Sequence, residues 1–175
     1  DIMGSERMIT MSMLEVTNVK KTYTSRIGAA KVEALKKVTF TAERGEYIAV
    51  MGESGSGKTT LLNILAALDK PTGGTVILDG TELSKVKEKE TAKFRRDNLG
   101  FVFQEFNLLD TFTVRDNILL PLVLMGMNYP EMEKKLMPVA EKLGIAQLLD
   151  KYPYEISGGQ KQRAAAARAI ITEPK

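Results

Sequence analysis

Short apolar runs predict β-strands in the first hundred residues of the chain. Residues 14–19 alternate apolar and polar positions, which is typical of a half-buried strand. Residues 47–51 form a continuous apolar run before a glycine-rich loop, as a buried strand does. Further strands are expected at residues 38–42, 75–78 and 99–103.

Helical spacing dominates the rest of the pattern. Apolar residues recur on one face after Lys58, and Pro71 should end that helix. Residues 85–96 are highly charged and are expected to form a solvated helix. Residues 114–149 read as helical, with interruptions at Gly126, at Asn128 to Pro130 and at Gly144, and Ser157 begins a last helix.

The length and composition of the chain argue against several classes of protein and of site. The 175 residues suit one domain, and a net charge of +3 is too small to suggest nucleic acid. The chain has no cysteine and no histidine, so disulfides, thiolate metal sites and histidine catalysis are excluded. The longest apolar run, residues 118–127, is much shorter than the roughly 20 residues of a membrane span.

A glycine-rich loop carries the clearest chemical signal. The pattern G-x-x-x-x-G-K-[ST] is satisfied by Gly52, Gly57, Lys58 and Thr59. Glycines let backbone N–H groups converge on an anion, and the following helix adds the positive end of its dipole. Lys58 supplies a charge for the β- and γ-phosphates, Thr59 a hydroxyl for Mg²⁺ and Thr60 a hydroxyl for the α-phosphate. This loop is predicted to bind a nucleoside triphosphate, which leaves open a kinase, a GTPase, a helicase or a transporter ATPase.

A second glycine-rich segment, ISGGQKQR, opens the last predicted helix. Ser157 and Gln160 have the spacing of a capping box, which explains a helix start. The box does not explain Gly158 and Gly159, because each glycine near a helix costs about 1 kcal/mol. This helix N-terminus is therefore predicted to be a second phosphate site. Two chains facing each other can place both sites on one γ-phosphate more easily than one chain can.

The order of these motifs resembles that of the ATP-binding cassette (ABC) ATPases. SGGQ followed by KQR is similar to the family signature, although Ile156 stands where leucine is usual. Gln104 looks like the Q-loop glutamine, and Tyr23 matches the aromatic residue that stacks on adenine. The segments GESGSGKTTLLNILAALDKPTGG, FQEFNLLDTFTVRDNILLPL and YPYEISGGQKQR look most like bacterial ATPases of the antimicrobial-peptide (bacitracin-type), macrolide-export and lipoprotein-release branch.

The resemblance implies a role for each motif residue. Lys58 and Gln104 would be catalytic, and Thr59 and Gln104 would bind the metal. The signature that acts on the partner's ATP would be Ser157, Gly158, Gly159 and Gln160. The residues that would bind ATP are Tyr23, Gly52, Glu53, Ser54, Gly55, Ser56, Gly57, Lys58, Thr59 and Thr60.

The resemblance also implies a cellular role. It is that of a cytoplasmic subunit, peripheral on the inner face of the cell membrane, with ATP and Mg²⁺ as cofactors. The subunit would pair with a second copy of itself on ATP and energise a separate membrane permease for peptide, antibiotic or lipid-like substrates. Family analogy places a docking groove for a permease helix between the Q-loop and residues 118–127. No nucleic-acid partner is expected.

The expected fold is α/β. It is a P-loop NTPase core with a mixed or parallel sheet, an N-terminal antiparallel β part and a helical insert subdomain. We expect a tag or linker at residues 1–10 and a nucleotide-binding core at 11–103. The Q-loop and helical subdomain would then occupy 104–157, and a truncated signature helix 158–175.

The family pattern would continue beyond ITEPK with a strand that ends in a Mg²⁺-binding aspartate and a catalytic glutamate (the Walker B region), and later with a switch histidine. The chain is therefore expected to be the first part of a longer protein, able to bind ATP but to hydrolyse it poorly.

Two alternatives stay open. One is a soluble ABC-type ATPase without a permease, in DNA repair or translation, which a long coiled coil or a second cassette would support. The other is a P-loop small-molecule kinase, against which SGGQ and the lack of a lid-like arginine cluster argue.

Overall fold

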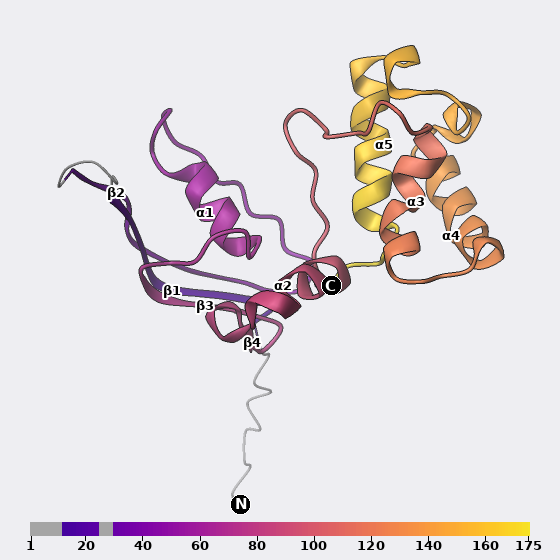
Figure 1. Cartoon of the computed structure of the whole chain (residues 1–175). Coiled ribbons are helices and arrows are strands. Elements are labelled where there is room, and N and C mark those ends of the chain that lie inside the picture. The colour runs from indigo at the N-terminus through magenta and orange to yellow at the C-terminus, as the bar shows by residue number, and fades with distance from the viewer. Residues whose placement is uncertain (1–11, 25–29) are drawn as a thin grey trace, which may run out of the picture. The chain divides into compact units, whose positions relative to one another are not determined.

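The computed structural model describes residues 12–24 and 30–175, so the tag or linker expected at residues 1–10 lies outside it. The chain forms two compact units, Asp1–Thr91 and Ala92–Lys175. The first unit holds the strands and the glycine-rich loop, and the second holds the helical region and the signature segment (Figure 1).

The sheet of the first unit is antiparallel in every pairing of the described strands. Its order is β2-β1-β3-β4. The strands expected at residues 14–19, 38–42 and 75–78 are confirmed, each inside or matching one of these strands. The bounds are β1 (Leu14–Thr24), β2 (Lys31–Ala42), β3 (Gly73–Leu78) and β4 (Thr81–Glu82).

The strands expected at residues 47–51 and 99–103 are not formed, and those two predictions were wrong for this structure. A strand exists only as a member of a hydrogen-bonded ladder, and neither segment has a ladder partner in the described chain. Continuous apolar composition indicates burial, but it does not supply that partner. The parallel strands expected at the centre of the sheet are therefore absent from the described residues, and Tyr47 and Met51 are 100% and 87% exposed.

The core of the first unit joins the sheet to the helix that follows the glycine-rich loop. Val16 on β1 is paired with Val76 on β3 and both are buried, and Val19 is buried beyond an irregularity in the register between Val16 and Val19. The helix α1 (Lys58–Leu65) buries Leu61 and Ile64, and Figure 1 shows it alongside the strands. The charged helix expected at residues 85–96 is confirmed in essence: a short 3₁₀ turn, η1 (Leu83–Lys85), precedes α2 (Glu88–Asn98), which has no buried residue.

The second unit is a small helical bundle. Its elements are α3 (Val114–Leu124), α4 (Tyr129–Lys142), η2 (Ala146–Leu148), η3 (Pro153–Glu155) and α5 (Gly158–Ile170). The breaks expected near Gly126, Asn128 and Gly144 are confirmed, and the Asn128 side chain caps α4 by accepting from the Glu131 amide. The fully buried residues Ile118, Leu122 and Leu136 lie in the core that joins α3 and α4 to α5.

A buried asparagine fixes the loop that enters this bundle. Asn117 is completely buried, and its Oδ1 accepts from the Leu109 amide at 2.7 Å. Its Nδ2 donates to the carbonyl oxygens of Leu109, Phe112 and Thr113. Both polar atoms of the Asn117 side-chain amide are thus hydrogen-bonded, which offsets the cost of burying them. The same bonds hold residues 109–113 in one conformation.

Among the helices of the described residues, none is both long and apolar enough to traverse a lipid bilayer.

Candidate functional site

The glycine-rich loop packs against strand β2 at a point where only glycine fits. Gly57 precedes α1 with φ of 90°, and a Cβ there would lie 2.4 Å from the carbonyl oxygen of Ala34. A Cβ at Gly52 would lie 2.6 Å from Ser56 Oγ, so this second glycine keeps the loop closed on itself. The sequence pattern is therefore explained by close backbone approach, as expected for a loop that wraps a ligand.

Lys58 curls back over the loop that precedes it. Its Nζ donates to the carbonyl oxygens of Gly52 and Glu53 at 2.7 and 2.5 Å. Both acceptors are neutral, so the ammonium keeps its full charge for an anion bound at the loop. None of the described side chains caps α1, so the first N–H groups of this helix also face the loop without a side-chain partner.

The other expected loop residues are accessible. The backbone turns at Ser56, whose amide donates to the Glu53 carbonyl oxygen at 3.2 Å. Thr60 is half-buried on the first turn of α1, and Thr59 is exposed beside it. The exposed members of the loop are Gly52, Glu53, Ser54, Gly55 and Ser56. A ligand at this loop would thus meet backbone amides, hydroxyl groups and one ammonium group.

The sheet brings Tyr23 close to the loop. Tyr23 on β1 pairs with Val32 on β2, and Ala34, against which Gly57 packs, is two residues further along β2. Two residues along a strand and one strand across give a separation of roughly 8 Å. The Tyr23 side chain is 42% exposed, so a planar group held beside the loop can reach its ring.

The surroundings of Tyr23 include two residues that the sequence analysis missed. The Tyr23 hydroxyl donates to Asp69 Oδ2 at 2.9 Å, and Lys21 Nζ donates to Asp69 Oδ1 at 2.6 Å. The same ammonium lies 4.8 Å from the centroid of the Tyr23 ring. Burial alone would raise the pKa of Asp69, but hydrogen bonds from Lys21, Tyr23 and the Lys70 amide outweigh it and lower the pKa below its usual value.

The signature segment begins α5 as expected. Ser157 Oγ accepts from the Gln160 amide at 3.4 Å, and Gln160 Oε1 accepts from the Ser157 amide at 2.8 Å, which confirms the capping box. In the described chain, no atom apart from the immediate neighbours lies within 4 Å of a Cβ added at Gly158 or Gly159. Neither glycine has a positive φ. Neither close packing nor backbone conformation thus requires glycine at these two positions, and the two glycines leave an open surface at the start of α5.

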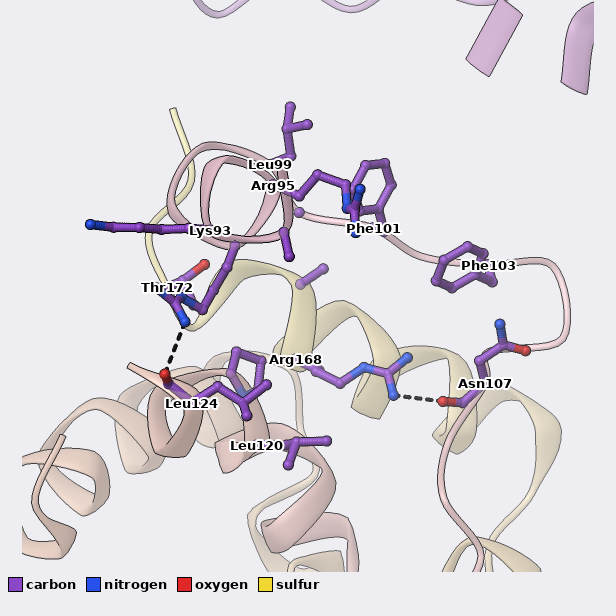
Figure 2. Close-up of a pocket in the computed structure, with 15 residues that line it drawn as sticks. Lys93, Arg95, Leu99, Phe101, Phe103, Asn107, Leu120, Leu124, Arg168 and Thr172 are labelled. Atoms are coloured by element: carbon purple, nitrogen blue, oxygen red, sulfur yellow. Dashed lines mark hydrogen bonds between the residues drawn. The ribbon is translucent and has the colours of Figure 1, made fainter. Parts of the chain in front are cut away.

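Gln104 is exposed in a turn held by a residue of α5. Two residues of that turn, Phe106 and Asn107, have positive φ values of 61° and 46°. Arg168 donates to the carbonyl oxygens of both, each at 2.6 Å, and Figure 2 marks the bond to Asn107. Burial lowers the pKa of Arg168. Sequence reasoning missed Arg168, because no local pattern links it to a turn about sixty residues earlier.

A cavity of about 530 Å³ lies beside this turn, within the second unit. Its wall includes Asn107, Leu120 and Pro121, together with aromatic rings from residues 101–103. In Figure 2 the rings of Phe101 and Phe103 lie on the opposite side of the cavity from Leu120. Apolar side chains therefore line much of the cavity, and four basic residues line it as well, Lys93, Arg95, Arg96 and Arg168.

The candidate residues thus fall into two groups. Tyr23 and the loop of residues 52–60 belong to the first unit, whereas Gln104 and the signature segment belong to the second. Within the described chain we find no cluster of three or more acidic, histidine or cysteine side chains that could hold a metal ion. A divalent ion at Thr59 would therefore have to share its coordination with phosphate oxygens, which is the usual mode for Mg²⁺.

A protein-family model described as ABC transporter matches residues 35–175. This span includes the glycine-rich loop, Gln104 and the signature segment. The chain belongs to the ABC transporter family. The resemblance inferred from the motifs is confirmed.

The relatives of this ABC transporter chain include the expected bacterial branch. The bacitracin export ATP-binding protein BceA of Halalkalibacterium halodurans is 52% identical over 164 residues, which cover 94% of this chain and 64% of that protein. The ABC transporter ATP-binding protein YxdL of Bacillus subtilis is 52% identical over 163 residues, with coverage of 93% and 62%. The chain thus spans less than two thirds of the length of these relatives.

Solved structures confirm the expected fold class of this ABC family member. The ATP-binding cassette MJ0796, solved as a dimer in a post-hydrolysis state with ADP and Pi, has a TM-score of 0.82 and 39% identity, covering 93% of this chain and 71% of that one. The cbiO1 protein of Clostridium perfringens, part of the ABC transporter complex cbiONQ, has a TM-score of 0.79 and 30% identity, with coverage of 94% and 63%.

Proposed function

We propose that this chain is the nucleotide-binding part of an ATPase subunit that energises a separate membrane permease. The observation that carries the proposal is the packing of the glycine-rich loop on β2. It places the ammonium of Lys58, the free N-terminus of α1 and the ring of Tyr23 along one short stretch of the first unit. This arrangement suits a ligand with an anionic tail and a planar base.

Each residue of the first group would meet a different part of ATP. Residues 52–60 would surround the phosphates, with Lys58 moving from its carbonyl partners to the β- and γ-phosphate oxygens. Tyr23 would stack on the adenine. Thr59 would hold Mg²⁺, and the ion would neutralise charge on the transferring phosphoryl group. Gln104, in the second unit, is proposed as a further metal-binding residue. Gln104 would also orient the attacking water.

The signature segment would act on the ATP of a second copy of the chain. The Ser157 oxygen is engaged as a helix cap, but its O–H proton remains available to a phosphate oxygen. The open surface over Gly158 and Gly159 would let that phosphate approach the N-terminus of α5. Gln160 would keep the cap closed while the phosphate binds.

The permease would be an integral-membrane partner, with this subunit peripheral on the cytoplasmic face. The cavity beside Asn107, Leu120 and Pro121 lies where the docking of a permease helix is expected, which supports this role. The name of the relative BceA supports a peptide antibiotic as the transported substrate. Peptide, antibiotic or lipid-like cargo is therefore the class that we propose.

A mixing experiment with the full-length protein tests the proposal. Lys58→Ala and Ser157→Arg should each lose ATPase activity as pure proteins, because each damages both sites of a dimer. A dimer of one variant with the other would keep one intact site, made of Lys58 from the second protein and Ser157 from the first. Mixing the two should therefore restore a substantial fraction of the wild-type rate.

Two results would contradict the proposal. An active Lys58→Ala protein would show that the loop does not serve ATP hydrolysis. Inactive mixtures at every ratio, under conditions in which the two variants form the mixed dimer, would contradict a role for Ser157 across a pair of subunits.

A further inference from the structure

We propose that Asp69 and Lys21 are positioning residues that hold the Tyr23 ring ready for base stacking. The inference rests on the proposed function, since it assigns the ring to the base of a bound nucleotide. Asp69 joins the two side chains, accepting from the Tyr23 hydroxyl through Oδ2 and from the Lys21 ammonium through Oδ1.

Lys21 is an unusual residue for the interior of a small sheet. It is 9% exposed, and its ammonium also donates to the carbonyl oxygen of Lys70 at 2.8 Å. The Asp69 side chain of this ion pair is 29% exposed, and ion pairs contribute little net stability whether they lie at the surface or in the interior. We therefore explain the ion pair of Lys21 and Asp69 by its contacts with Tyr23. The Lys21 ammonium lies 4.8 Å from the centroid of the Tyr23 ring.

These contacts restrict the Tyr23 side chain before a ligand arrives. The hydroxyl end is tied to Asp69 and the ring lies beside Lys21, yet 42% of the side chain is still exposed. Without the hydrogen bond to Asp69, the Tyr23 side chain would lose rotamer freedom when it stacked on a base. Removing the tie should therefore weaken base binding by roughly 3- to 10-fold.

The position of Asp69 links the base to the phosphates. Asp69 comes four residues after the end of α1, and its amide donates to the carbonyl oxygen of Asn63 in that helix at 3.2 Å. The helix that starts at the phosphate-binding loop thus ends beside the residue that holds Tyr23. We infer that α1 sets the spacing between the two ends of the nucleotide site.

A double-mutant cycle measures this coupling. Tyr23→Phe keeps the ring and removes the hydroxyl, and Asp69→Asn keeps the shape and removes the charge. Each single change should lower ATP affinity roughly 3- to 10-fold. The double variant should bind ATP no more weakly than the weaker-binding of the two single variants. Tripolyphosphate, which has no base, should bind all of these proteins as it binds the wild type. Asp79→Asn, a matched change in the same unit, should leave both affinities unchanged.

The outcomes separate this inference from the proposed function. If Lys58→Ala binds ATP normally, the proposed function fails. If Lys58→Ala loses ATP while Tyr23→Phe and Asp69→Asn bind it like the wild type, only the positioning role fails. Additive losses in the double variant, or equal losses for ATP and tripolyphosphate, would also overturn it. Tyr23→Phe is the decisive protein should Asp69→Asn fold poorly, because the ion pair of Lys21 and Asp69 stays intact in it.

Discussion

The two units of the chain differ in packing: the second unit has a closed helical core, whereas the first unit leaves its glycine-rich loop exposed. In the second unit, α3, α4 and α5 enclose a core in which Ile118, Leu122 and Leu136 are fully buried. In the first unit, the glycine-rich loop is exposed, and the segment that leads to it leaves Tyr47 and Met51 in solvent. One unit is held together by side-chain packing, whereas the other keeps backbone and charge available to a ligand.

Because of this difference, the substitutions that change stability and those that change ligand binding should fall in different parts of the chain. A substitution in the helical core should change the free energy of unfolding, whereas a substitution in the glycine-rich loop should change ligand affinity. The following predictions run from the largest expected effect to the smallest.

Leu122→Ala should lower the free energy of unfolding of the second unit by about 2–5 kcal/mol, because it opens a cavity in a closed core. Leu124→Ala is the matched control on the same helix, since Leu124 is 64% exposed, and it should cost about 0.5 kcal/mol or less. Urea denaturation followed by circular dichroism measures both. Equal losses in the two variants would show that the core is not the determinant of stability here.

Asn117→Ala should destabilise the second unit by about 1–3 kcal/mol. The change removes the acceptor of the Leu109 amide and takes one donor away from each of the carbonyl oxygens of Leu109, Phe112 and Thr113. Hydrogen exchange of residues 109–113 should accelerate as well. A variant as stable as the wild type, with unchanged exchange, would mean that this loop is held by other contacts.

Ser157 offers a way to separate capping from phosphate binding. Ser157→Ala should cost about 1 kcal/mol, because the Gln160 amide loses its acceptor. Ser157→Asp should keep the cap and the stability, since aspartate caps as well as serine does. The same variant should lose ATPase activity in the full-length protein, because its carboxylate would repel a phosphate. An active Ser157→Asp protein would leave Ser157 with a capping role alone.

The smallest effect should be a pH dependence from Asp69. Its pKa is lowered in the folded chain, since its hydrogen bonds outweigh the effect of burial, so the ionised carboxylate stabilises the fold. That stability is fully present above the unfolded pKa of about 3.9 and is lost as the pH falls through the lower, folded value. The stability difference between wild type and Asp69→Asn should therefore shrink in acid. A difference that stays constant below pH 4 would contradict the assignment.

Local signals in the sequence predicted much of this structure. Asn128, Gly144 and Ser157 mark helix ends, because capping and helix termination depend on a few neighbouring residues. The glycine-rich loop was equally readable from its spacing. The strands expected at residues 47–51 and 99–103 were not, because strand formation depends on a partner that the local pattern does not specify.

The contacts around the candidate residues were the least predictable part. Lys21 meets Asp69 across 48 positions of the chain, and Arg168 meets Asn107 across 61. Neither pair has a periodic or compositional signal, since each depends on how separate elements pack. The tertiary structure is therefore needed to find the residues that hold Tyr23 and the Gln104 turn.

The most direct measurement is the calorimetric titration of ATP and Mg²⁺ into this chain, its Lys58→Ala variant and the control Lys36→Ala. Lys36 is an exposed lysine of β2. Loss of the charge-assisted hydrogen bonds of Lys58 should weaken binding about 100-fold, whereas Lys36→Ala should bind like the wild type. Equal ATP affinity in all three proteins would contradict the assignment of the glycine-rich loop as a phosphate site.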